Sequence, residues 1–85
     1  MIVTVAGLPN IRSDRTLINV EEVVSERTHP VQVERISDAY ELCKLGVIQT
    51  PSVLVNHKLK VAGRIPNMHE IERWLDEELV LDEAV

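Results

Sequence analysis

The chain has 85 residues, which allows one domain and no more. Its formal net charge is −5, and its nine Lys and Arg residues are scattered, whereas a nucleic-acid-binding surface needs a basic stripe. No apolar run is long enough for a membrane span, and the first residues lack the basic start and cleavage site of a signal peptide. We therefore expect a domain that binds neither nucleic acid nor membrane.

Aromatic side chains and sulfur are scarce in this chain. Tyr40 and Trp74 are the only aromatic residues, so the core must be built from Val, Ile and Leu. Cys43 is the single cysteine and cannot form an internal disulfide, which favours a reducing, cytoplasmic setting.

The chain opens with a strand and a long helix. Residues 2–6 form an apolar run that predicts the first strand. Apolar side chains then recur at helical spacing and predict an amphipathic helix. A cap at Ser13 or Asp14, or Pro9 in the first helical position, would begin this helix. It should end near residues 26–28, because the following proline disfavours helix before it.

A second strand and a short helix come next. Residues 31–36 alternate at first and predict the strand. Residues 39–45 predict the helix, with Ser37 or Asp38 as its N-terminal cap. Gly46 should close it, because glycine readily adopts the left-handed conformation of a C-terminal cap.

Two further strands are predicted over residues 52–56 and 58–63. The first is a continuous apolar run, which is typical of a central strand, and Pro51 opens it where a missing amide donor costs least. Asn56 and His57 have the character of a two-residue hairpin turn.

A last helix begins at Asn67, which has the spacing of a capping box with Glu70. Trp74 lies one position off the apolar stripe and can anchor this helix or a partner. Residues 80–85 predict a frayed acidic tail, which leaves 1–79 as the domain. The apolar stripe consists of Met68, Ile71, Leu75 and Leu79.

The predicted order is therefore β-α-β-α-β-β-α, an α/β fold. Strands joined through helices should be parallel, and the last two strands should form an antiparallel hairpin, which gives a mixed four-stranded sheet. No internal repeat or low-complexity segment is visible.

The motif Gly-Val-x-x-Thr-Pro ends at Pro51, and Gly-Arg-x-Pro follows at residues 63–66 after two strands and a turn. This arrangement resembles the second half of the thioredoxin fold, and the chain is most similar to small archaeal and bacterial thioredoxin-like proteins. The resemblance extends from Ile2 to about Leu79. It implies that Pro51 is the cis-proline that lies against the redox site in that family, and Thr50-Pro51 is a candidate cis peptide on chemical grounds too.

In that family, the loop after the first strand carries Cys-x-x-Cys at the start of the first helix, where the helix amides lower the pKa of a thiol. The matching stretch here is Leu8-Pro9-Asn10-Ile11. Leu8 and Ile11 can attack no disulfide, so both dithiol and monothiol exchange are excluded at these positions. We predict no catalytic residue there.

Our first functional hypothesis is a redox-inactive thioredoxin-fold protein that binds a protein or an extended peptide. Its binding face would consist of Leu8, Pro9, Asn10, Ile11, Thr50 and Pro51, with Ile48 adding to the apolar lining. Exposed together, such side chains form an apolar patch of the kind that marks contact surfaces. The alternative is that Leu8 and Ile11 pack into the core.

Two other hypotheses remain. Cys43 could be the reactive thiol of an enzyme or a redox sensor, although a lone cysteine is more often a buried, inert side chain, and we expect burial. Alternatively, the apolar face could join two copies of the chain in a homodimer. We do not predict an enzyme.

The remaining polar residues carry weaker signals. His29, His57 and His69 have no metal-ligand spacing and should be exposed, so we predict no metal or cofactor. Arg64 could bind an anion or a partner carboxylate, but an ion pair near the sheet end is the better expectation. The acidic run at residues 76–78 should be a solvated surface, because a catalytic acid needs a desolvated carboxyl group.

Overall fold

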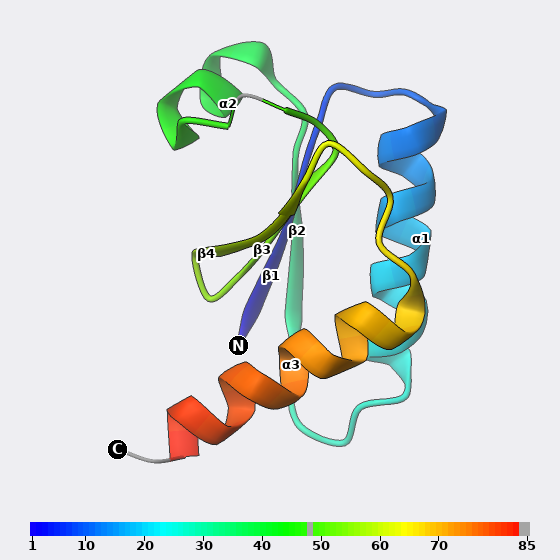
Figure 1. Ribbon diagram of the computed structural model, residues 1–85, viewed down its shortest axis with the longest axis vertical. Helices are drawn as coiled ribbons and strands as arrows, with labels where there is room; N and C mark the ends of the chain where they lie inside the picture. Colours follow the sequence, from blue (N-terminus) through cyan, green and yellow to red (C-terminus); the bar gives the residue numbers. More distant parts are fainter. Residues whose placement is uncertain (48, 84–85) are drawn as a thin grey trace.

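The computed structural model describes residues 1–47 and 49–83. Its four strands and three helices follow each other in the predicted order, which confirms the α/β class (Figure 1). The elements are β1 (Ile2–Ala6), α1 (Ile11–Ser25), β2 (Gln32–Ile36), α2 (Ala39–Leu45), β3 (Ser52–Val55), β4 (Lys58–Ala62) and α3 (Met68–Glu83). None of the helices in the described ranges is both long and apolar enough to cross a membrane.

The strands form one mixed sheet in the order β2-β1-β3-β4. β1 and β2 are parallel, and β3 and β4 form the predicted antiparallel hairpin. The prediction that β3, which follows β2 through a helix, is parallel to β1 and β2 is wrong, because β3 is antiparallel to β1. The reason is the length of α2: seven residues of helix span only about 10 Å. The chain therefore enters β3 at the end of the sheet where β2 stopped.

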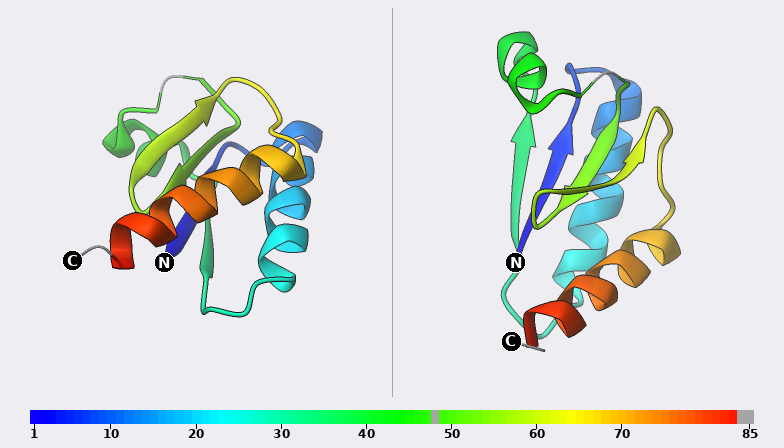
Figure 2. Two further views of the ribbon diagram at one scale, coloured as in Figure 1. Left: turned by 60° about the horizontal axis from the view of Figure 1, so that its bottom comes forward. Right: turned by 60° about the vertical axis from the view of Figure 1, so that its left-hand side comes forward.

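The helices cover the two faces of the sheet unequally (Figure 2). α1 and α3 pack on one face, where the sequence builds an aliphatic core with one tryptophan. α2 covers part of the other face with a smaller cluster around Leu42. β3 is buried along its whole length, as its continuous apolar run predicts. The larger core consists of Val3, Val5, Val20, Val23, Val53, Val55, Val61, Ile71, Trp74 and Leu75.

The start of α1 differs from the prediction. Its N-terminal cap is Asn10, whose Oδ1 accepts a 2.8 Å hydrogen bond from the backbone N–H of Ser13. The expected caps at Ser13 or Asp14 and the expected first position of Pro9 are therefore wrong, because Asn10 satisfies the helix amides first. At the other end, α1 closes on Glu26, at the beginning of the range expected for its end.

The turns around α2 and β4 are as predicted. Asp38 caps α2, and Gly46 ends it in the left-handed conformation with φ 73°. Asn56 and His57 both have positive φ, 50° and 68°, which suits a tight hairpin turn between β3 and β4.

The last helix begins as predicted and ends later. Asn67 and Glu70 form the expected capping box: Glu70 N–H donates to Asn67 Oδ1 at 2.8 Å, and Asn67 N–H donates to Glu70 Oε1 at 3.2 Å. α3 continues through Glu83, so the frayed tail predicted over 80–85 is wrong for residues 80–83, and Ala84 and Val85 lie outside the described residues.

The buried stripe of α3 also differs from the predicted one. The buried positions are Ile71, Trp74, Leu75 and Glu78, which keep helical spacing. Met68 is exposed instead of buried, and Trp74 takes its place in the core. The stripe is thus rotated by one position, because it follows the line along which α3 crosses the sheet.

Candidate functional site

Three segments meet at one end of the sheet, at the top of Figure 1: the loop after β1, the start of α1 and the segment that leads into β3. Gly7 joins them. Its N–H donates to Ile36 O at 2.9 Å, and a Cβ atom at Gly7 would lie 3.6 Å from the Cβ of Thr50. The redox site expected from the thioredoxin resemblance would lie at this end.

The predicted binding residues are largely exposed at this end. Leu8 is 48% exposed and Ile11 is 86% exposed, so the alternative that both pack into the core is wrong. Pro9 and Asn10 are exposed as well. The reason is that all four precede or begin α1, which turns its buried face to the sheet only from Ser13 onward.

The second half of the predicted face is less accessible. Thr50 is half-buried, and Pro51 is buried behind it. The peptide bond between them is cis. Ile48, predicted in the same apolar lining, lies outside the described residues.

Ser13 is a site residue that the sequence did not reveal. It is fully buried, and its Oγ has no hydrogen-bond partner among the described residues. A Cβ atom at Gly7 would lie 2.3 Å from this Oγ, so only glycine allows α1 to approach β1 so closely. The signal that could have found Ser13 is its position three residues after the cap, since Asn10 holds its N–H.

Asn10 and Ser13 occupy the cap and the third helical residue of α1, where the helix amides would stabilise a thiolate most strongly. Leu8 lies two residues before the cap. The positions suited to a thiol pair in this structure are therefore 10 and 13, three residues apart, as well as the pair 8 and 11 taken from the sequence. Neither pair contains sulfur, so thiol exchange at the start of α1 is chemically excluded for both.

A second loop packs beside the start of α1. Arg12 Nη2 donates to Gly63 O at 2.7 Å, and Asn19 Nδ2 donates to Pro66 O at 3.0 Å. Residues 63–66 therefore lie along α1. Arg64 in this loop pairs with Glu70, as predicted.

The ion pair between Arg64 and Glu70 is bidentate, with one Nη1–Oε1 distance of 2.9 Å. Hydrogen bonds from Arg64 and from the Asn67 backbone lower the pKa of the Glu70 carboxyl from 4.5 to about 2. The same contact raises the pKa of Arg64. Arg64 is thus already engaged by a carboxylate of its own chain.

A family model described as Thioredoxin domain matches residues 2–76, which include both predicted halves of the site. The chain belongs to the thioredoxin domain family. Comparisons with curated proteins and with solved structures found no match.

The single cysteine of this thioredoxin domain is exposed, so the expected burial of Cys43 is wrong. α2 buries only Leu42, because a seven-residue helix at the end of a sheet presents a narrow face to it. Cys43 is the next residue after Leu42 and is not on the buried side of α2.

Two of the three histidines in this thioredoxin domain lie where they were expected. His57 and His69 are exposed, but His29 is half-buried, and its Nε2 has no hydrogen-bond partner among the described residues. His29 lies in the connection between α1 and β2. Within the described ranges, no group of three or more His, Cys, Asp or Glu side chains could hold a metal ion.

The acidic run of α3 contains a further correction. Asp76 and Glu77 are exposed as predicted, but Glu78 is only 2% exposed. Its carboxylate lies 3.0 Å from Lys58 Nζ and 2.9 Å from Lys60 Nζ, and these hydrogen bonds, first that of Lys60, lower the pKa of Glu78. We call Glu78, Lys58 and Lys60 the Glu78 cluster; its ion pairs connect β4 with α3.

Proposed function

We propose that this thioredoxin domain binds an extended segment of a partner protein at the end of the sheet where α1 begins, and performs no thiol exchange there. The surface is called the helix-start face; it consists of the exposed residues Leu8, Pro9, Asn10 and Ile11 together with the half-buried Thr50 and the buried Pro51. The observation that carries the proposal is the exposure of Leu8 and Ile11, 48% and 86%.

The exposed parts of these two side chains contribute little to the stability of the isolated domain. An aliphatic side chain stabilises a fold through the apolar area that it buries, and Ile11 buries very little. Leu8 adds a second aliphatic side chain three residues earlier, in the loop before α1. Neighbouring exposed apolar side chains of this kind mark contact surfaces.

The missing chemistry supports binding over catalysis. Residues 7–13 contain no sulfur, and Cys43, the single cysteine, lies on α2. A single cysteine also supports a reducing, cytoplasmic setting. In thioredoxins, the backbone beside the proline that corresponds to Pro51 pairs with the substrate chain, which supports an extended segment as the ligand.

Peptide selection tests this function. Random decapeptides displayed on phage are selected against the immobilised wild type and against Leu8→Ser/Ile11→Ser. We expect the wild type to enrich a family of peptides, and we expect the variant to bind them at least about tenfold more weakly, since it loses two apolar contacts. The matched control is Val80→Ser/Leu81→Ser, which alters two exposed aliphatic side chains on α3 and should bind like the wild type.

Failure of the wild type to enrich any peptide family would contradict the proposal, as would equal enrichment by Leu8→Ser/Ile11→Ser. Light scattering of the same proteins separates the alternative in which a second copy of the chain covers the face. A mass twice the 9.6 kDa of one chain that falls to 9.6 kDa in Leu8→Ser/Ile11→Ser would identify the partner as the chain itself.

The exposure of Cys43 favours a second candidate, a thiol enzyme or redox sensor that acts through this side chain alone. Such a thiol reacts faster than an ordinary cysteine because it is held as a thiolate. Reaction with an aromatic disulfide reagent at neutral pH measures this property. A rate above that of the urea-unfolded chain would favour this candidate, and a rate at or below it would reject the candidate.

A further inference from the structure

We infer that the segment bound at the helix-start face is acidic, with carboxylates that pair with Arg12 and Arg15 beside an apolar side chain. The inference rests on the proposed function of this face and names the chemistry of its ligand. It follows from the way in which the chain distributes its ion pairs.

Seven of the nine basic side chains have a carboxylate partner within the chain, at N–O distances from 2.5 to 3.9 Å. They are spread along the chain from the connection after α1 to α3. The seven are Arg27, Arg35, Lys44, Lys58, Lys60, Arg64 and Arg73.

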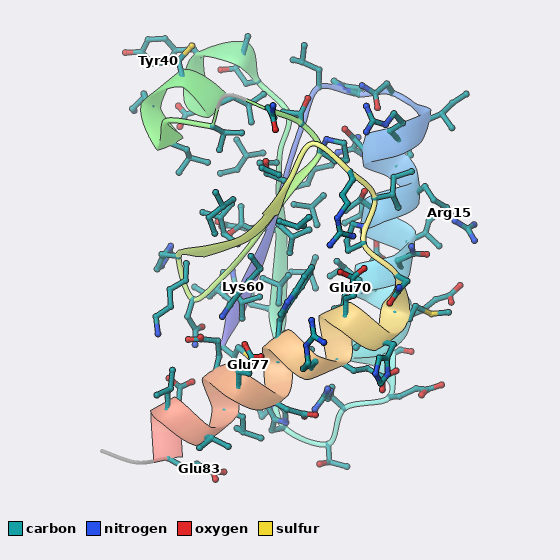
Figure 3. The ribbon with its side chains drawn as sticks, viewed as in Figure 1. Arg15, Tyr40, Lys60, Glu70, Glu77 and Glu83 are labelled. Atoms are coloured by element: carbon teal, nitrogen blue, oxygen red, sulfur yellow. The ribbon has the colours of Figure 1, made fainter. Side chains whose placement is uncertain are left out.

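Arg12 and Arg15 are the two that differ. Within the described ranges, no carboxylate lies at ion-pair distance from either side chain. Both are exposed, and Figure 3 shows Arg15 pointing away from the sheet on the outer side of α1. Although the chain has 14 acidic residues, Arg12 and Arg15 have no ion-pair partner in the part of the chain that the structure describes, and they lie one turn apart on one helix.

Their position is at the edge of the helix-start face. Arg12 directly follows Ile11, and Arg15 lies one turn further along α1. Asp14, the acidic residue between them, turns to the β2 side, where its Oδ1 accepts a 2.6 Å hydrogen bond from Arg35. The positive end of the helix dipole adds to the positive potential at this edge.

Arg12 is also held in place before any ligand binds. Its Nη2 donates to Gly63 O at 2.7 Å, which fixes the guanidinium beside the loop over residues 63–66. Such fixing lowers the entropy lost when a ligand binds. A guanidinium with remaining free donors is suited to a carboxylate, which it can bind through two parallel hydrogen bonds.

The surroundings favour an acidic peptide over a nucleic acid. Leu8 and Ile11 offer aliphatic surface, whereas nucleic-acid sites rely on many phosphate contacts and stacking aromatics. With a net charge of −5, the rest of the chain repels a long polyanion. A short segment that carries one or two carboxylates beside an apolar side chain matches both features of the face.

The test uses the peptides selected by the wild type. We expect an excess of Asp and Glu beside Leu, Ile, Val or Phe, and we expect a synthetic, dye-labelled peptide of this kind to bind Arg12→Gln/Arg15→Gln about tenfold more weakly in fluorescence anisotropy. Raising NaCl from about 0.02 M to about 0.5 M should weaken wild-type binding and leave the variant nearly unchanged. The control is Lys44→Gln/Arg73→Gln, which removes two exposed cations elsewhere and should bind as the wild type does.

Two results would overturn the inference while leaving the proposed function intact: selected peptides without an acidic excess, or unchanged binding by Arg12→Gln/Arg15→Gln when Leu8→Ser/Ile11→Ser loses binding. Displacement of the labelled peptide by an oligothymidylate of about 20 nucleotides at equal concentration would also overturn it, because phosphates would then be the preferred ligand. Failure of the wild type to select any peptide would overturn both.

Discussion

The helix-start face and the Glu78 cluster lie at different ends of the same small sheet. They differ in whether their side chains find partners within the fold. In the Glu78 cluster, a buried carboxylate has two lysine partners at 2.9 and 3.0 Å. At the helix-start face, two aliphatic side chains are exposed, and the adjacent Arg12 and Arg15 have no carboxylate among the described residues.

The difference separates stability from binding. Polar and charged groups that pair with each other within the fold stabilise it, and they have no free donor or acceptor for a partner. Groups that the fold leaves unsatisfied add little to its stability and can be satisfied by another molecule. Substitutions in the Glu78 cluster should therefore change the free energy of unfolding, whereas substitutions in the helix-start face should change binding with little effect on that free energy.

The largest expected effect on stability follows from Glu78→Ala. The substitution leaves Lys60, whose side chain is only 15% exposed, without its buried partner. We expect the free energy of unfolding to fall by about 2 to 3 kcal/mol, below the usual cost for a fully buried pair, because Lys58 can turn into solvent and Lys60 keeps Glu77 at 3.5 Å. Urea unfolding followed by circular dichroism measures it. Glu77→Ala removes an exposed carboxylate that also pairs with Lys60, at 3.5 Å, and with Arg73, at 3.9 Å. It should cost less than about 1 kcal/mol, because ion pairs of exposed carboxylates contribute little, and equal losses would contradict this description.

The same variant has a pH signature. The pKa values of Glu78 and Glu70 are lowered in the folded chain, so both carboxylates contribute stability above the unfolded pKa near 4.5 and lose it as the pH falls through their folded values, about 2 for Glu70. The difference in unfolding free energy between the wild type and Glu78→Ala should therefore be constant from pH 7 to pH 5 and shrink below pH 4.5. A difference that grows in acid would be incompatible with the lowered pKa of Glu78.

A smaller effect, of opposite sign, is expected beneath the helix-start face. Ser13→Ala removes a buried hydroxyl group that has no partner among the described residues, so the free energy of unfolding should rise by up to about 1 kcal/mol. Thr16→Ala is the matched control one turn along α1. It removes a buried hydroxyl group that donates to Arg12 O at 2.9 Å, and it should lower the free energy of unfolding by about 1 kcal/mol. A loss of stability in both variants would show that Ser13 is satisfied after all.

The sequence predicted those parts of the fold that local patterns determine. The capping box of Asn67 and Glu70 and the closing Gly46 each depend on a few neighbouring residues, and each is found where it was predicted. The direction of β3 was missed, because it depends on how far a seven-residue helix can carry the chain.

The site was predicted less completely for a related reason. The stretch over residues 8–11 and its lack of sulfur are visible in the sequence, but the capping of α1 by Asn10 is decided by which side chain reaches the helix amides first. The burial of Glu78 and the exposure of Cys43 depend on the angle at which each helix crosses the sheet. That Arg12 and Arg15 have no carboxylate partner among residues 1–47 and 49–83 can be seen only once the ion pairs of the other Lys and Arg residues are known.

The most direct test of the division between chemistry and binding is the reduction of insulin by dithiothreitol, followed as turbidity, with the wild type added. Asn10→Cys/Ser13→Cys serves as the positive control, because it places two thiols at the cap and third residue of α1, where the Asn10 side chain already accepts a hydrogen bond from the Ser13 backbone N–H. Leu8→Cys/Ile11→Cys tests the alternative pair. We expect the wild type to leave the rate at that of dithiothreitol alone and at least the Asn10→Cys/Ser13→Cys variant to accelerate it. Acceleration by the wild type itself would contradict our account and would assign thiol chemistry to Cys43.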